Sequence, residues 1–179
     1  MKVKDLSLRP FTSDGAVSGL RLKASIKRDS DIFTLGYTLT GPVAGLGLPA
    51  AARKTSRKKA LWEDTCFELF LGVRNSPRYW EFNISPAGDW NVYRFNDYRK
   101  DMQEEPAINS LPVIIEHSPE AFRLFVNINL EVIIPADKVV EAALSAVIKQ
   151  VNGPATYWAL EHKGPRPDFH RRDGFIIEL

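Results

Sequence analysis

The stretch that decides the fold is LWEDTCFELFLGVR (61–74), followed by YWEFNISPAGDWNVYRF (79–95). Apolar and polar side chains alternate through both, and the turn signal Pro-Ala-Gly-Asp stands at 86–89. Alternation with a period of two predicts β-strands that bury one face, and the turn residues predict an antiparallel hairpin. We therefore expect three adjacent antiparallel strands here.

Similar runs continue along the rest of the chain. The predicted strands are about 20–28, 32–40, 65–73, 78–85, 90–97, 112–117, 122–130, 144–151, 155–160 and 174–178. The segment from Pro135 to Glu141 favours a short helix, because proline suits a first helical turn. Many strands joined by hairpin turns predict an all-β fold, an antiparallel β-sandwich of immunoglobulin-like or jelly-roll-like type with at most one or two short helices. No repeat or composition shift divides the chain, so residues 1–179 are expected to form a single domain.

The composition narrows the class of protein. With 24 basic and 22 acidic residues, the overall charge gives little attraction for nucleic acid or anionic membranes. Asp5 and Arg9 interrupt any apolar run at the start of the chain, so no secretory signal is expected there. No apolar run elsewhere is long enough to span a membrane. The single cysteine, Cys66, excludes an intramolecular disulfide and fits a reducing compartment. We expect a cytoplasmic protein with no nucleic-acid or membrane partner.

The longest connection is the 41–60 loop, which ends in a basic run from Arg53 to Lys59. Long loops in compact domains are often functional or mobile. Charge runs are usually solvated surface features, however, so the expectation for this run is a solvated loop without a nucleic-acid role.

Strand parity sorts the side chains into two faces. Phe67, Leu69 and Leu71 alternate with Glu68, so the apolar set is expected in the core. Continuing the alternation into the next two strands places Glu81, Asn83 and Arg94 on the face of Glu68. This could be an ordinary solvated sheet face, but aromatic side chains of the same parity favour a ligand platform.

The chain contains four tryptophans, each of which is expected either in the core or on the surface. Trp80 has core parity, whereas Trp62 and Trp158 stand at junctions between loops and strands and are the candidates for exposure. An aromatic ring can stack on the apolar face of a pyranose while carboxylate, amide and guanidinium groups bond its hydroxyls. A carbohydrate or similar polyhydroxylated small ligand fits this combination.

The segments LWEDTCFELFLG, YWEFNISPAGDWNVYRFNDYR and ATYWALEHKGPRPDFHRRDGFIIEL resemble the DOMON-like domains related to type-9 carbohydrate-binding modules. The resemblance spans the chain from about Gly19 and implies a non-catalytic β-sandwich that binds sugar. It implies that Trp62 and Trp158 clamp the sugar and that Glu68 and Arg94 bond its hydroxyls. Glu81 and Asn83 are expected to add supporting polar contacts.

Some relatives of this fold carry haem between Met and His ligands, which would give Met102 and one of His117, His162 or His170 a role here. No motif pairs Met102 with a histidine, so haem is not expected. Calcium stays open as a cofactor through loop carboxylates such as Glu63, Asp64 and Asp89, and no other metal is expected.

Two other functions compete with sugar binding. Glu68 and Glu81 could act as the carboxyl pair of a glycoside hydrolase, although carboxylates near an arginine more often bind than catalyse. The aromatic face could instead dock a protein partner, with no sugar ligand.

Overall fold

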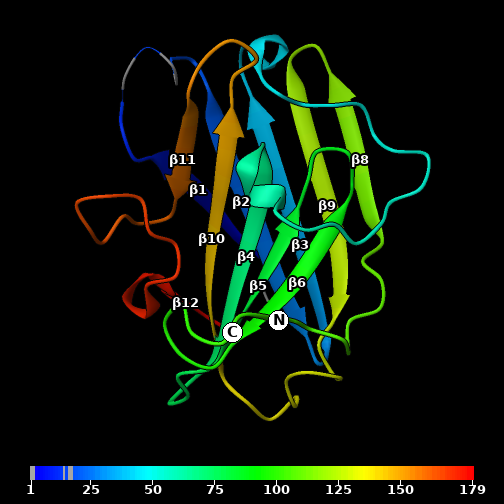
Figure 1. Ribbon diagram of the computed structural model, residues 1–179, viewed down its shortest axis with the longest axis vertical. Helices are drawn as coiled ribbons and strands as arrows, with labels where there is room; N and C mark the ends of the chain where they lie inside the picture. The colour runs from blue at the N-terminus through cyan, green and yellow to red at the C-terminus, as the bar shows by residue number, and fades with distance from the viewer. Residues whose placement is uncertain (1–2, 14, 16–17) are drawn as a thin grey trace.

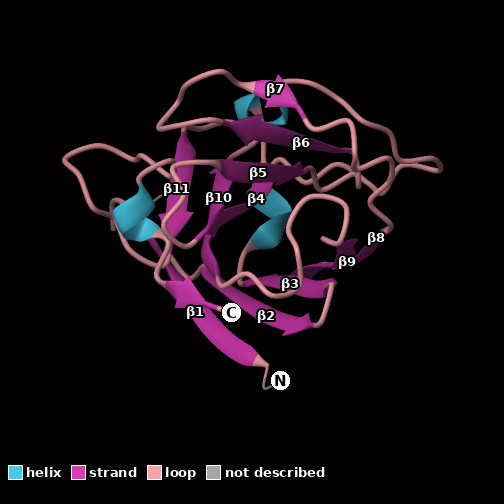
Figure 2. Cartoon of the chain, turned by 90° about the horizontal axis from the view of Figure 1, so that it is seen from below, coloured by secondary structure: helices cyan, strands magenta, loops and turns pink. Residues whose placement is uncertain are grey.

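A computed structural model of the chain, which describes residues 3–13, 15 and 18–179, shows antiparallel strands curled into two packed layers (Figures 1 and 2). The first layer, called the β2 sheet, has the order β1 (Lys4–Pro10), β2 (Arg21–Asp29), β3 (Ile32–Thr40), β9 (Ala121–Asn129) and β8 (Val113–Ser118). The second, called the β4 sheet, has the order β7 (Gln103–Glu104), β6 (Trp90–Phe95), β5 (Tyr79–Ile84), β4 (Cys66–Val73), β10 (Val140–Lys149) and β11 (Ala155–Ala159). A short β12 (Ile177–Glu178) pairs with the beginning of β10.

Strand β1 joins the two layers at one edge. Lys4 to Leu8 pair with β2, whereas Arg9 and Pro10 pair with β11 of the other sheet. The predicted antiparallel β-sandwich is confirmed, and the predicted strand at 32–40 coincides with β3. The sequence did not predict β1 or the two-residue β7.

The core lies between the sheets and is built from alternate residues of each strand. Leu35 and Tyr37 of β3 face Phe67 and Leu69 of β4, and all four side chains are fully buried. The Phe67 ring stacks on Phe122 of β9 with centroids 5.2 Å apart. Because these rings and branched chains alternate along their strands, one face of each sheet becomes apolar and the sheets close on each other.

The outer face of the β4 sheet is also covered. Strand β4 is buried on both faces, and the outward side chain of Phe70 belongs to a second apolar cluster with Tyr79, Phe95 and Phe175. The cover comes from the irregular 160–176 segment, which lies over β4 and β10. This face is therefore not the solvated sheet surface that the sequence left open.

The short helix expected from Pro135 to Glu141 does not form. Its backbone carbonyls turn toward the buried Arg28 of β2, whose guanidinium donates to the oxygens of Pro135, Ala136 and Lys138. Those carbonyls are thus satisfied by a side chain instead of by a helical ladder. The helices of the described residues are one-turn 3₁₀ elements: η2 (Val43–Gly45), η3 (Leu61–Glu63) and η4 (Arg172–Gly174).

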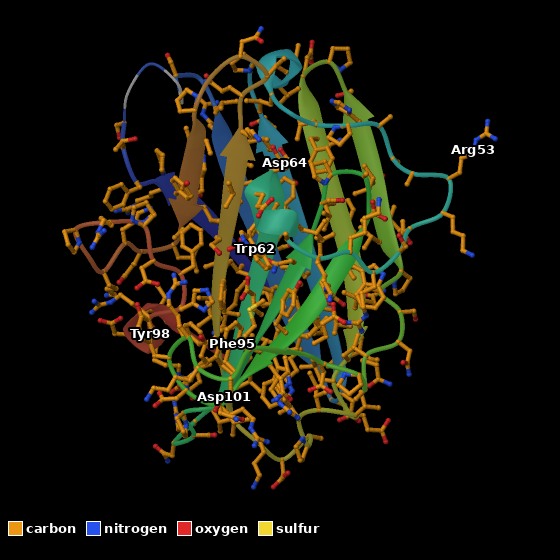
Figure 3. The ribbon with its side chains drawn as sticks, in the orientation of Figure 1. Arg53, Trp62, Asp64, Phe95, Tyr98 and Asp101 are labelled. Carbon is orange, nitrogen blue, oxygen red and sulfur yellow. The ribbon has the colours of Figure 1, made fainter. Side chains whose placement is uncertain are left out.

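The 41–60 loop is partly structural, which corrects the expectation of a wholly solvated basic run. Arg53 projects from the loop (Figure 3). Arg57, in contrast, lies over the Trp90 ring and donates to the Asn91 side chain at 2.7 Å. Lys58 forms an ion pair with Asp89 at 2.7 Å. No helix in the described part of the chain is long and apolar enough to cross a bilayer.

Candidate functional site

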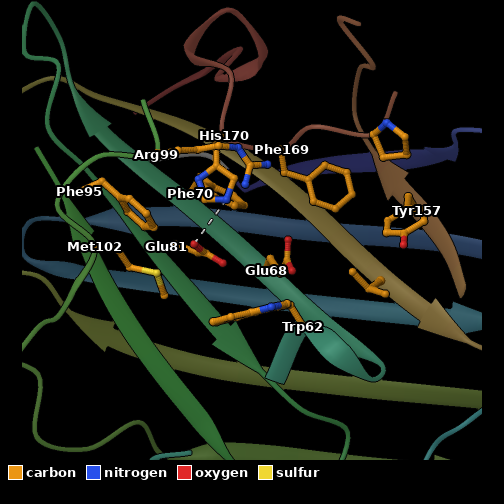
Figure 4. A pocket seen from close by; sticks show the side chains of 12 residues that line it. Trp62, Glu68, Phe70, Glu81, Phe95, Arg99, Met102, Tyr157, Phe169 and His170 are labelled. Atoms are coloured by element: carbon orange, nitrogen blue, oxygen red, sulfur yellow. Dashed lines mark ion pairs between the residues drawn. The ribbon is translucent and has the colours of Figure 1, made fainter. Parts of the chain in front are cut away.

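A pocket of about 400 Å³ opens on the outer face of the β4 sheet (Figure 4). Its floor comes from β4 and β5, and its walls come from η3, the 96–102 loop, β11 and the 160–176 segment. The lining residues are Trp62, Glu68, Phe70, Glu81, Phe95, Arg99, Met102, Val147, Tyr157, Pro167, Phe169 and His170.

Two carboxyl groups stand on the floor. Glu68 of β4 pairs with Asn83 of β5, and Phe70 pairs with Glu81, so the glutamates are diagonal neighbours on one face. Diagonal neighbours in an antiparallel pair lie about 7–8 Å apart, close enough for long side chains to interact. Only 3% of Glu68 and 4% of Glu81 is exposed.

Burial governs the charge of Glu68. Desolvation, reinforced by the nearby Glu81, raises the pKa of Glu68 to about 8, although the hydroxyl of Ser145 and the charge of Arg99 act against the rise. The Ser145 hydroxyl donates to Oε2 of Glu68 at 2.9 Å. Among the described residues, the other oxygen, Oε1, has no hydrogen-bond partner. Glu68 thus brings a free carboxyl oxygen to a pocket that it lines.

Glu81 is held by a relay of buried side chains. Asn83, which is fully buried, donates to Oε1 of Glu81 at 2.8 Å and accepts from the Cys66 thiol at 3.5 Å. Burial raises the pKa of Glu81 to about 7, opposed by the Asn83 hydrogen bond and by Arg99. Asn83 therefore positions Glu81, which brings the carboxyl group to the pocket.

His170 closes the pocket above Glu81. Its Nδ1 lies 2.8 Å from the Tyr79 hydroxyl, and its Nε2 lies 3.8 Å from Oε2 of Glu81. The Tyr79 hydroxyl also accepts from the backbone N–H of Arg99, which leaves its own proton free to be donated to Nδ1. Burial, followed by the charge of Arg99, lowers the pKa of His170 to about 4, so the ring is neutral and carries its proton on Nε2, facing Glu81.

Asp168 ties two walls of the pocket together. It accepts from the Tyr98 hydroxyl at 2.6 Å and forms an ion pair with Arg99 at 3.0 Å, both on the 96–102 loop. It also accepts from the backbone N–H of His170 at 3.2 Å. Arg99 has a left-handed backbone conformation with φ 53°, a strained state for a residue with a side chain. One carboxylate thus fixes Arg99 and His170 relative to each other.

Trp62 forms the opposite wall. It lies on the one-turn helix η3, and Ala60, just before that helix, has a left-handed φ of 57°. The indole meets Tyr93 edge to face, with centroids 5.6 Å apart, and 38% of the residue stays exposed. Tyr93 holds the ring while an exposed surface remains for a ligand. Figures 3 and 4 show the place of Trp62.

Two of the predicted binding residues lie elsewhere. Trp158 is 2% exposed in the core between the sheets, and its indole N–H donates to Thr156 at 2.9 Å. The expected clamp of Trp62 and Trp158 is therefore wrong. Arg94 pairs across the sheet with Trp80, so it shares the core parity of that residue and binds the Gln103 side chain. The predicted place of Arg94 on the face of Glu68 is therefore wrong, because its side chain lies on the opposite face of the sheet.

The pocket contains residues that the sequence reasoning did not select. Tyr157 lines it because β11 turns this side chain outward, opposite Val147, while the adjacent Trp158 turns inward. The aromatic residue that lines the pocket is therefore the immediate neighbour of the predicted one, on the opposite face of the strand. Arg99 lies in a charged irregular loop, where no period or motif marks it. Phe169 comes from an equally irregular segment.

The residues considered for haem do not fit that group. Met102 and His170 do line the same pocket, but both ring nitrogens of His170 face other side chains, Tyr79 and Glu81. His162 binds the carbonyl of Arg9 at 2.9 Å and does not line the pocket that contains Met102. His117 packs edge to face on Phe122.

Two of the three carboxylates considered for calcium, those of Asp64 and Asp89, are held by lysines. Asp64 binds Lys149 at 2.7 Å, and Asp89 binds Lys58 at 2.7 Å. Among residues 3–13, 15 and 18–179, no group of three or more His, Cys, Asp or Glu side chains is placed to hold a metal ion.

The fold has known counterparts among solved structures. A provisionally assigned carbohydrate-binding protein from Bacteroides uniformis matches with a TM-score of 0.71 and 13% identity, over 97% of this chain and 84% of that one. A family 9 carbohydrate-binding module from Caldicellulosiruptor kristjanssonii, solved with glucose, matches with a TM-score of 0.52 and 15% identity, over 87% of this chain and 73% of that one. The structure of such a module from the same organism with cellotriose gives 0.52 and 13%, over 88% and 71%.

These likenesses establish the fold as an antiparallel β-sandwich shared with family 9 carbohydrate-binding modules. No family model matches the sequence. No curated protein matches it either.

Proposed function

We propose that this protein binds a carbohydrate, without catalysis, in the pocket on the outer face of the β4 sheet. The observation that carries the proposal is the pocket itself, where the open face of Trp62 stands beside the buried carboxyls of Glu68 and Glu81. Ring stacking together with fixed hydrogen-bonding groups is the combination that a pyranose needs.

The size and chemistry of the pocket suit one sugar ring. Its volume of about 400 Å³ lies at the small end of ligand sites. Trp62 would stack on the apolar face of the ring, and Oε1 of Glu68 would bond a hydroxyl. Glu81 would bond a second hydroxyl, held in place by Asn83.

The structural neighbours support the proposal. One is a provisionally assigned carbohydrate-binding protein, and the family 9 modules were solved with glucose and with cellotriose. At 13–15% identity their ligands do not transfer residue by residue. The chemistry of this pocket therefore carries the proposal.

Isothermal titration calorimetry against a panel of mono- and disaccharides tests the proposal. We expect at least one saccharide to bind, and Trp62→Ala to abolish the heat without lowering the melting temperature. Ile114→Ala, at an exposed position on β8 of the other sheet, is the matched control and should bind like the wild type. Absence of binding to every saccharide would contradict the proposal and favour the protein-interaction function.

Glycoside hydrolysis is the second candidate, since the two carboxyls are diagonal neighbours and inverting glycosidases place theirs about 6.5–9.5 Å apart. The pKa values of both are raised, however, and an inverting enzyme also needs an ionised base. Aryl glycosides of the sugars that bind provide the assay. Release of the aryl group, lost in Glu68→Gln and Glu81→Gln, would make the protein an enzyme.

Three other predictions remain as they were. They are the relation to DOMON-like domains, the single-domain organisation and the cytoplasmic location. These predictions agree with the proposed function but do not support it. Mass spectrometry of limited-proteolysis products would test the domain organisation, since a single resistant fragment is expected.

A further inference from the structure

The pocket holds two acidic groups and no cation that is free to balance them. Arg99 is the basic side chain whose charge acts on both Glu68 and Glu81, and it is engaged in an ion pair with Asp168 at 3.0 Å. His170 is neutral, as described above. Once Arg99 and Asp168 are counted together, no cation among the described residues that line the pocket is left to balance Glu68 and Glu81 if they ionise.

Burial makes this imbalance costly. Two carboxylates that are almost fully buried and diagonal on one sheet cannot both ionise without a counter-charge. In the free protein they avoid the cost by keeping protons, which is why their pKa values are raised. A cation that entered the pocket would remove the cost directly.

The acceptors for such a cation are already in place. Oε1 of Glu68 has no hydrogen-bond partner among the described residues. Oε2 of Glu81 faces Nε2 of His170 at 3.8 Å, which is too long for a hydrogen bond. Both carboxyls point into the cavity (Figure 4). An ammonium group, with three donors, could bond both oxygens.

We propose that the pocket selects a sugar bearing a protonated amino group, with the ammonium held between the carboxyls of Glu68 and Glu81. This inference rests on the proposed function, because it names the class of sugar for the same site. The exposed face of Trp62 stacks on the pyranose, and the aromatic rings of Tyr157 and Phe169 complete the lining.

The same surroundings disfavour other sugars. An acidic or phosphorylated sugar would meet two carboxyls. An N-acetylated amine has the same connectivity but no charge, and its bulk would occupy the space between the carboxyls. The titratable and charged groups that interact with the carboxyls are Tyr37, Cys66, Tyr79, Tyr93, Arg99 and His170. Only Arg99 is charged near neutral pH, and Asp168 balances it.

Calorimetry at about pH 6, where an amino sugar is protonated, tests the inference. Glucosamine, galactosamine and mannosamine are each compared with the parent sugar and the N-acetyl derivative. We expect at least one amine to bind about 10- to 100-fold more tightly than both, the gain of one or two charge-assisted hydrogen bonds. Parent sugars that bind as tightly as their amines would overturn the inference and leave the proposed function intact. No binding by any sugar would overturn the proposed function itself.

Proton release gives an independent readout. Amine binding should ionise the carboxyls, so titrations in buffers of different ionisation enthalpy should show protons released for the amine and none for the parent sugar. Glu68→Gln and Glu81→Gln should each reduce the preference for the amine while stacking on Trp62 persists. Glu120→Gln, an exposed control on the turn before β9, should change nothing. An amine preference that survives both pocket substitutions would contradict the inference.

Discussion

Tyr157 and Trp158 are consecutive residues of β11, and their side chains lie on opposite faces of the β4 sheet. Tyr157 stands opposite Val147 and lines the pocket, while Trp158 stands opposite Ala146 and is buried between the sheets. Each pair follows the alternation of a strand. The two neighbours should therefore have separable roles, one in binding and one in stability.

Substitution by alanine separates these roles. Trp158→Ala leaves a core cavity and removes the hydrogen bond that the Thr156 hydroxyl accepts from the indole, and should lower the free energy of unfolding by about 3–5 kcal/mol. Tyr157→Ala should lower it by less than about 1 kcal/mol and weaken saccharide binding. Urea denaturation and calorimetry on both variants provide the measurement. Similar stability losses in the two variants would contradict the assignment of faces.

His170 should make the protein sensitive to acid. Its pKa is about 4 in the folded protein, against an ordinary 6.5. The unfolded chain therefore binds a proton that the folded protein does not bind. The free energy of unfolding decreases as pH falls from about 6.5 toward 4. The loss should reach about 3 kcal/mol at most. His170→Gln should flatten this limb in urea titrations at several pH values, whereas His117→Gln, at an exposed site, should not.

Glu68 acts in the opposite direction. Its pKa is raised from 4.5 to about 8, so the folded protein keeps a proton that the unfolded chain releases. Its contribution to stability is present below about pH 4.5 and is lost as pH rises through 8. Glu68→Gln should make the unfolding free energy less dependent on pH between 5 and 8. An unchanged slope would mean that the carboxyl is already ionised in the free protein.

Asp168 should control the order of the pocket walls more than the stability of the sandwich. Asp168→Asn removes the ion pair with Arg99, a partly exposed contact that contributes about 0–1 kcal/mol. Hydrogen exchange should accelerate at His170 and across the 96–102 loop, and saccharide binding should weaken. Asp173→Asn, whose carboxylate pairs with the partly exposed Arg171, is the control and should leave exchange at those sites unchanged.

Arg28 should be needed for the 135–138 turn. Arg28→Met keeps the length of the buried side chain but removes its donors. The carbonyls of Ala136 and Lys138 then lose their partner, and that of Pro135 keeps only the backbone N–H of Lys138. We expect the free energy of unfolding to fall by about 2–4 kcal/mol, measured by urea denaturation. A loss under 1 kcal/mol would show that water replaces the guanidinium.

Alternation in the sequence was enough to predict the sandwich, because both sheets bury one face and strands repeat with a period of two. It placed Glu68, Glu81 and Asn83 on one face, and the register of β4 with β5 does bring them together. It failed at Arg94 and Trp158, since a shift of one residue moves a side chain to the opposite face. The bounds of a strand are the least certain part of such reasoning.

The walls of the pocket could not be predicted in this way. Arg99, Phe169 and His170 lie in irregular segments, whose path is set by contacts between distant residues. The hydrogen bond from Tyr98 to Asp168 joins residues 70 positions apart. The helix expected at Pro135 does not form for the same reason, because its carbonyls accept hydrogen bonds from Arg28, which is distant in the sequence.

The order in which a ribosome delivers the chain has a consequence for this site. Trp62, Glu68 and Glu81 emerge long before Phe169 and His170, which complete the enclosure. A nascent chain can pair β4 with β5 early, yet its two acids then face solvent or a chaperone and ionise like ordinary surface groups. The ability to recognise a ligand is thus acquired in the last steps of synthesis, when the 160–176 segment settles over the sheet.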